Sequence, residues 1–206
     1  MRLLLLGALT MLLANCASVS TLQTARVLDE GDSFHSIGLS LYSSDDFIGG
    51  DDISLPLIEY TYRRGVWEDI DFGIKLALIG ASVIDMKYNL ISDDKLALAT
   101  GVGIGYLSYT STVNGQDSDS TIIDFILPLY LSYDIGEKTT LYSAAKYMFR
   151  TISNDVVSTE DDSLVSATGG VQLGRKSGVF LEASLISSLD TDFSGTQFNG
   201  SYFFRF

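Results

Sequence analysis

The 206-residue sequence is poor in the residue types that most catalytic and metal sites require. It has one cysteine and one histidine, so it offers no cysteine pair for an internal disulfide or a cysteine-rich metal site. Hydrolytic sites commonly place a histidine beside serine or aspartate as acid and base. The one histidine, His35, stands at the start of an apolar segment. The sequence therefore predicts neither an enzyme nor a bound cofactor.

Basic residues and long apolar runs are also scarce. The chain has 13 Lys and Arg against 26 Asp and Glu, a net charge of −13, and no basic patch that would bind nucleic acid. The main apolar run is residues 3–13, and no later segment has the roughly 18 apolar residues of a membrane-spanning helix. Yet 46% of the residues are hydrophobic, which excludes a disordered chain. Its length fits one domain.

Residues 1–15 have the pattern of a secretory signal peptide, with a basic start and an apolar middle. Its end, "LANC" at residues 13–16, resembles the lipobox of bacterial lipoproteins, whose cysteine becomes the lipidated first residue of the mature chain. The resemblance implies lipidation of Cys16 and, because Ala17 rather than Asp follows, transport to the outer membrane. Asn15 stands where the lipobox usually has a small residue, so ordinary cleavage near Ala17 or Ser18 is the alternative.

Beyond the signal peptide, residues 16–32 lack periodicity and are predicted to form a lipidated N-terminus and a periplasmic tether. Residues 33–206 repeat one theme, about ten alternating residues and then a turn. The repeats cover residues 33–43, 53–63, 69–79, 82–91, 95–109, 121–133, 139–150, 163–174, 178–187 and 196–206. Their length matches that of a tilted strand that crosses a bilayer.

The two faces of these segments differ in size as well as polarity. In residues 69–79, Phe72, Ile74 and Leu76 share one face, whereas Asp71 and Lys75 share the other. A soluble β-sandwich also alternates, but its water-facing side is rich in Lys, Glu and Thr. Here the second face holds Gly, Ala, Ser and single charges, which suit a crowded concave interior. The pattern favours a ten-stranded antiparallel transmembrane β-barrel over 33–206; eight or twelve strands and a soluble β-sandwich lipoprotein are the alternatives.

The connections and the C-terminus agree with this interpretation. The second, fourth, sixth and eighth connections are short, and most of the others are long, as in outer-membrane barrels with short periplasmic turns. The final "SYFFRF" places Tyr202, Phe204 and Phe206 on one face. It resembles the C-terminal assembly signal of outer-membrane β-barrel proteins, with Phe203 turned inwards as a departure. The resemblance implies recognition by the barrel-assembly machinery, surroundings of outer-membrane lipid and lipopolysaccharide in a Gram-negative-type bacterium, and periplasmic chain ends.

Charged residues of both signs occur on the predicted inner face. They are Glu59, Arg63, Asp71, Lys75, Asp85, Lys87, Asp124, Lys146, Arg150, Glu182 and Arg205. Because an unpaired buried charge is costly, these groups are predicted to pair and to hold a narrow barrel shut. The alternative is a narrow passive channel for small solutes, or for an apolar ligand.

Acidic residues gather in the predicted outer loops without basic neighbours. Those considered as Ca²⁺ or Mg²⁺ ligands are Asp45, Asp46, Asp51, Asp52, Asp161 and Asp162. Oxygen ligands in loops suit these ions, which would bridge the loops to lipopolysaccharide phosphates. The alternative is a solvated, repulsive surface. The sequence thus favours a non-enzymatic surface protein with a structural or interaction role.

Overall fold

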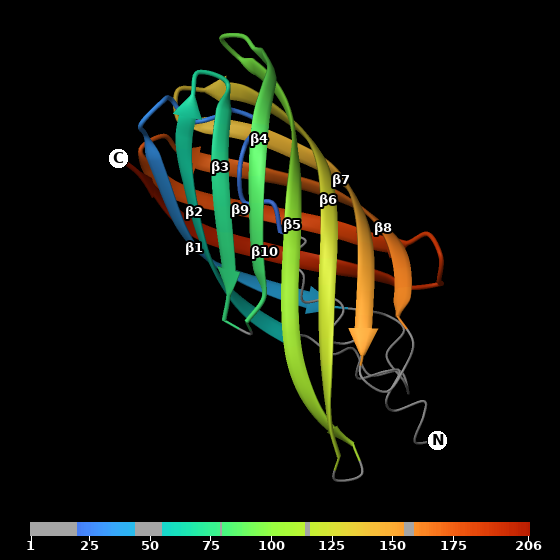
Figure 1. Ribbon diagram of the computed structural model, residues 1–206. Coiled ribbons are helices and arrows are strands. Elements are labelled where there is room, and N and C mark those ends of the chain that lie inside the picture. Colours follow the sequence, from blue (N-terminus) through green and yellow to red (C-terminus); the bar gives the residue numbers. More distant parts are fainter. Residues whose placement is uncertain (1–19, 44–54, 79, 114–115, 155–158) are drawn as a thin grey trace.

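A computed structural model describes residues 20–43, 55–78, 80–113, 116–154 and 159–206 of the chain (Figure 1). The strands are β1 (Ser33–Ser43), β2 (Leu55–Trp67), β3 (Ile70–Ala77), β4 (Ser82–Ser92), β5 (Leu96–Val113), β6 (Gln116–Gly136), β7 (Thr139–Asn154), β8 (Glu160–Gly174), β9 (Ser177–Ser188) and β10 (Ser194–Arg205). Each pairs antiparallel with its sequence neighbours, and β1 pairs with β10 to close the barrel. The ten-stranded barrel is confirmed. The β-sandwich and the other strand counts are wrong, since these strands form one closed sheet.

No helix among these residues is long and apolar enough to span a membrane.

The predicted alternation sets which side chains face outwards. In β3, Phe72, Ile74 and Leu76 are each at least 40% exposed, whereas Asp71 and Lys75 are at most 8% exposed. The same division of large apolar residues outside and polar or slender residues inside recurs in the other strands. An apolar surface of this extent is unusual on a water-soluble monomer. The barrel wall is therefore built to contact an apolar medium.

The strands differ widely in length, and this was only partly predicted. β3 has 8 residues, whereas β6 has 21 and extends, with its partner β5, well past the neighbouring hairpins (Figure 1). The sequence placed this strand at 121–133 because the preceding residues are polar and do not alternate. Main-chain pairing nevertheless continues through Asp119 and Ser118. Beyond the apolar belt, main-chain hydrogen bonds maintain the hairpin although its residues form no apolar face.

The seam between β1 and β10 brings the chain end into the sheet. The main-chain N–H and carbonyl of Phe206 bond those of Ser33 at 2.9 and 3.0 Å. Phe204 stacks on the His35 ring with centroids 5.1 Å apart, and Tyr60 lies 2.7 Å from His35. Rings gathered on the outer wall near one rim are typical of the aromatic belt at a membrane interface.

Residues 20–32 take a course that the sequence did not predict. Instead of forming a tether outside the barrel, they run through its lumen (Figure 1). Ser20, Leu22 and Ala25 are at most 1% exposed. The segment reaches the rim at Gly65, whose carbonyl accepts the N–H of Gly31 at 3.0 Å, and then turns into β1. The tether interpretation is therefore wrong for these residues. Residues 1–19, including the predicted lipidation site Cys16, lie outside the described part of the chain.

The lumen accepts this segment because much of its wall is slender. The inner face of β5 consists of alanines and glycines along most of its length, and that of β1 includes Ser36, Gly38 and Ser40. A small barrel is normally filled by its own inward side chains. Here the lumen also holds residues 20–28, most of which are buried. We call residues 20–28 the lumen segment.

Candidate functional site

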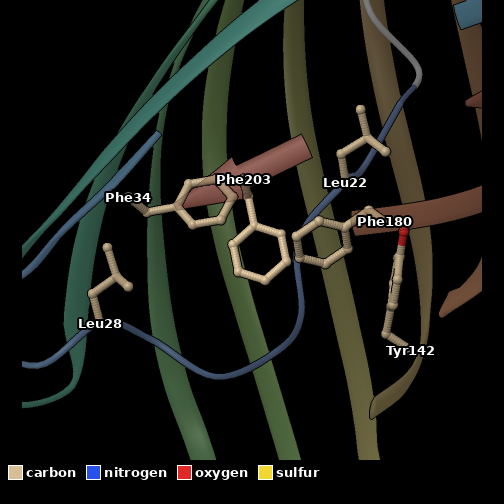
Figure 2. Packing of buried hydrophobic residues seen from close by; sticks show 6 residues of the cluster. All are labelled: Leu22, Leu28, Phe34, Tyr142, Phe180 and Phe203. Atoms are coloured by element: carbon tan, nitrogen blue, oxygen red, sulfur yellow. The ribbon is translucent and has the colours of Figure 1, made fainter. Parts of the chain in front are cut away.

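The lumen segment is anchored first by an apolar cluster near the rim that carries Phe206. Leu22 and Leu28 pack with four aromatic residues from the wall, Phe34, Tyr142, Phe180 and Phe203 (Figure 2). The rings of Phe34 and Phe203 stack with centroids 5.6 Å apart, and those of Phe180 and Phe203 lie 4.9 Å apart. Phe203 thus turns inwards, as expected, and it helps to fasten the N-terminal segment.

A charged network lies beside this cluster. A single Nη of Arg63 lies 2.6 Å from carboxyl oxygens of both Asp71 and Asp85, and Lys87 lies 3.3 Å from Asp71. The guanidinium passes over Gly73, where an added Cβ would lie 2.4 Å from Nη1 of Arg63. Three neighbouring strands are therefore joined through their inner side chains.

Two further arginines have different surroundings. Arg150 and Asp124 form a two-pronged pair with N–O distances of 2.7 and 2.9 Å, and both are at most 2% exposed. Arg205 instead lies over the rings of Phe34 and Phe203, at 5.8 and 5.9 Å from their centroids. It covers the apolar cluster at the rim.

Several inward charges, including Lys87 of the network above, bind the lumen segment itself. Lys75 and Lys146 both donate to the carbonyl of Ser20, at 2.6 and 3.0 Å, and the Ser20 hydroxyl donates to Glu59 at 2.5 Å. Lys87 donates to the carbonyls of Thr24 and Arg26 at 3.1 and 2.9 Å. The predicted pairing among wall charges is therefore incomplete, because several of them bind this segment.

Glu182 accepts four hydrogen bonds in the lumen. The N–H groups of Thr21 and Leu22 donate to its two oxygens at 2.7 Å each. Tyr142 and Asn199 add donors from the wall, also at 2.7 Å. Tyr142 reaches this carboxyl over Gly170, where an added Cβ would meet the ring at 2.4 Å. One carboxyl thus joins the segment to three strands.

At the rim, Arg26 fastens the segment to the turns. Its guanidinium lies 2.8 Å from Asp134 and donates to the carbonyls of Asp93 and Asp94 at 3.0 and 3.1 Å. Arg175 reaches the same Asp134 from the β8–β9 turn at 3.0 Å. Arg26 and Arg175 thus join this end of the segment to the β4–β5, β6–β7 and β8–β9 turns.

Little space remains around the segment. A cavity of about 30 Å³ lies between Ser20, Thr21 and the wall, and one of about 10 Å³ lies near Leu28. On the same measure, a cavity needs roughly 10–15 Å³ to hold one water molecule. Among the described residues, the lumen therefore holds only small cavities beside the segment at this level.

The acidic loop residues show less organisation. Asp161 accepts a hydrogen bond from Thr151 at 2.9 Å, and Asp162 accepts one from Ser188 at 2.6 Å. In the described part of the chain, no three acidic, histidine or cysteine residues come together as a metal site. Asp45, Asp46, Asp51 and Asp52 lie outside that part.

The sequence located the inward charges but did not reveal their partner. The eleven charged residues predicted to face inwards lie on the inner wall or at its rim. The lumen segment and its other contacts, Tyr142, Asn199, Arg26 and Asp134, were missed. The slender inner faces were the available signal, because such a wall cannot fill a ten-stranded barrel alone.

No family model and no curated protein sequence matches the chain. Among solved structures, the outer membrane protease OmpT from Escherichia coli matches with a TM-score of 0.51 and 10% identity, over 89% of this chain and 100% of that chain. The translocator domain of the autotransporter NalP from Neisseria meningitidis matches with 0.52 and 8%, over 98% and 95%. The attachment invasion locus protein Ail of Yersinia pestis gives 0.45 and 14%, over 86% and 99%. The chain has the fold of a bacterial outer-membrane β-barrel.

Proposed function

We propose that the chain is a closed outer-membrane β-barrel lipoprotein with a non-enzymatic, structural or interaction role. The observation that carries the proposal is the lumen segment, whose main chain is bound by charged residues of the wall. A passive channel for solutes or for an apolar ligand would require the lumen segment to move out of the barrel interior. A closed barrel would carry out a structural or interaction role through its outer surface and its loops.

The proposed orientation follows from the rims. The short turns and Phe206 would face the periplasm, and the extended β5–β6 hairpin and acidic loops would face outwards among lipopolysaccharide. Tyr202, Phe204 and the terminal Phe206 would be read by the barrel-assembly machinery. Calorimetric titration of the solubilised protein with Ca²⁺ and Mg²⁺ tests the proposed ion bridge, for which saturable heat is expected. A flat titration removes it.

Planar-bilayer recording tests the closed state. The purified full-length protein should migrate differently on gels with and without heating, which shows a folded barrel, and should give no steady current. Long-lived openings of the unmodified protein would contradict the proposal and favour the channel.

Lipidation is tested at the N-terminus. Only three residues separate Cys16 from Ser20, so the lipidated end and the lumen segment would be one continuous stretch. Mass spectrometry of the N-terminal peptide should show an acylated Cys16, and the Cys16→Ala variant should lose the modification. An unmodified peptide beginning at Ala17 or Ser18 would contradict lipidation and leave the barrel proposal intact.

A further inference from the structure

We infer that the lumen is a binding site for an extended polypeptide, which it recognises mainly through the main chain and which the lumen segment occupies within the same molecule. The inference rests on the proposed closed state and goes further, since it names the class of ligand that the closed lumen accepts.

Charged wall residues bind six main-chain groups of the segment. Glu182 accepts the N–H groups of Thr21 and Leu22, Asp71 accepts that of Leu28 at 3.2 Å, Lys75 and Lys146 donate to the carbonyl of Ser20, and Lys87 donates to the carbonyls of Thr24 and Arg26. Acidic residues thus meet N–H groups and basic residues meet carbonyls. Every polypeptide carries these groups, whatever its side chains.

Side-chain contacts in the middle of the segment are weaker. Thr21 lies 3.3 Å from the hydroxyl of Thr168, and Gln23 lies 3.1 Å from that of Tyr130. The main-chain bonds to Glu182 measure 2.7 Å and that from Lys75 measures 2.6 Å. Hydrogen bonds with a charged partner are shorter and roughly twice as strong as those between neutral groups. The polar recognition of residues 20–24 therefore depends chiefly on the main chain, whereas Leu22 and Ala25 contribute apolar packing.

The conformation of Leu22 fits the same purpose. Its φ of 45° lies in the left-handed region, and the two successive N–H groups of Thr21 and Leu22 converge on the carboxyl of Glu182. Successive N–H groups arranged in this way form a nest for an anion. In this lumen the wall supplies the anion and the segment supplies the nest.

Three side chains fix the position of the bound segment. Leu22 and Leu28 enter the apolar cluster, and Arg26 reaches Asp134 at the rim. The ligand class is thus an extended peptide with apolar residues six positions apart and a basic residue two positions before the second. Between these anchors Ala25 is fully buried against Ala97, Ala99 and Tyr130, so the site also requires a small residue there.

A matched pair of full-length variants separates the contribution of the main-chain N–H of Thr21 from that of its side chain. Thr21→Pro removes the N–H bonded to Glu182, whereas Thr21→Ala removes the side chain and keeps the N–H. In bilayer recordings, Thr21→Ala should stay as closed as the unmodified protein, and Thr21→Pro should open at least about tenfold more often, the equivalent of one hydrogen bond to a charged group. Heat-dependent gel migration must show both barrels folded.

If Thr21→Pro fails to fold, the chain with Leu22 replaced by its α-hydroxy acid serves instead, because the resulting ester lacks the N–H and keeps the side chain. A synthetic peptide of residues 20–28 should then reclose the opened variant. The same peptide N-methylated at the nitrogens of Thr21 and Leu22 should not.

Equal opening of Thr21→Ala and Thr21→Pro, or equal block by the two peptides, would overturn the inference while leaving the closed barrel intact. So would an N–H-deleted variant that folds and stays closed. Steady current through the unmodified protein would instead overturn the proposed function.

Discussion

The main-chain N–H of Leu22 donates to Oε2 of Glu182 at 2.7 Å, and Leu22 holds a φ of 45° where this bond forms. Its side chain is 1% exposed within the apolar cluster. A left-handed conformation costs a residue other than glycine ~1–3 kcal/mol and persists only where the surroundings enforce it. The bond to Glu182 and the apolar cluster hold Leu22 from two sides, which makes it the fixed point of the lumen segment.

Replacing Leu22 by Gly and by Ala tests this conformation, because at a positive φ Gly should disturb the segment no more than Ala does. In the middle of a helix or strand, Gly lowers the free energy of unfolding by ~0.5–1 kcal/mol relative to Ala. Both Leu22→Ala and Leu22→Gly lose the buried side chain, but Gly adopts positive φ without strain. We expect amides of residues 21–28 to exchange hydrogen no faster in Leu22→Gly than in Leu22→Ala. At Ala25, which is buried without positive φ, Ala25→Gly should exchange faster than the unmodified chain. Faster hydrogen exchange of these amides in Leu22→Gly than in Leu22→Ala would show that the backbone at residue 22 is not strained.

The docking of the segment at the rim is tested at Gly65. An added Cβ there would lie 2.0 Å from the carbonyl oxygen of Asp29 and 2.7 Å from that of Leu28. These are main-chain atoms, so the segment must move. Gly65→Ala should therefore speed the hydrogen exchange of the amides of Gly31 and Asp32, with the barrel still folded.

Gly169→Ala is the matched control, because a Cβ at Gly169 meets nothing within 4 Å. It should leave the exchange of these amides unchanged. Equal effects of the two substitutions would mean that the segment does not rest on Gly65.

The wall of the barrel was predictable because the sequence of each strand shows which of its faces is apolar. Alternation in a segment such as 69–79 reports which side faces the apolar medium, and that preference does not depend on distant partners. Strand ends were less certain: the first residues of β6 pair with β5 although their polar sequence has no apolar face.

The lumen segment was not predictable in the same way. It is short and aperiodic, and its partners are distant in sequence: Thr21 and Glu182 are 161 positions apart. Its bonds also use main-chain groups, which leave no trace in residue identity. The inward charges were visible, but the sequence could not distinguish charges that pair with one another from charges that bind a peptide.

The pair of Asp124 and Arg150 tests how much a buried ion pair contributes to this wall. Arg150→Met leaves the carboxyl of Asp124 buried without the partner that binds it through two bonds. Loss of one partner of a buried pair typically costs ~3–5 kcal/mol, whereas replacing both by apolar residues is often neutral or stabilising. Urea unfolding in lipid vesicles should show this loss for Arg150→Met. The double variant Asp124→Leu with Arg150→Met should recover most of it; equal stability of the single and double variants would argue against coupling.

The membrane position of the wall is tested by two residues of equal exposure. Leu127 and Ile135 lie on β6, both face outwards, and they are 57% and 56% exposed. Leu127 lies well within the apolar wall, whereas Ile135 adjoins the short turn after β6. In a bilayer, Arg at the midplane costs ~2–4 kcal/mol and ~0–1 kcal/mol near the interface. In vesicles, Leu127→Arg should therefore lower the free energy of unfolding by ~2–4 kcal/mol and Ile135→Arg by less than ~1 kcal/mol. Water treats both exposed sites alike, so equal and small effects would show that the wall does not face lipid.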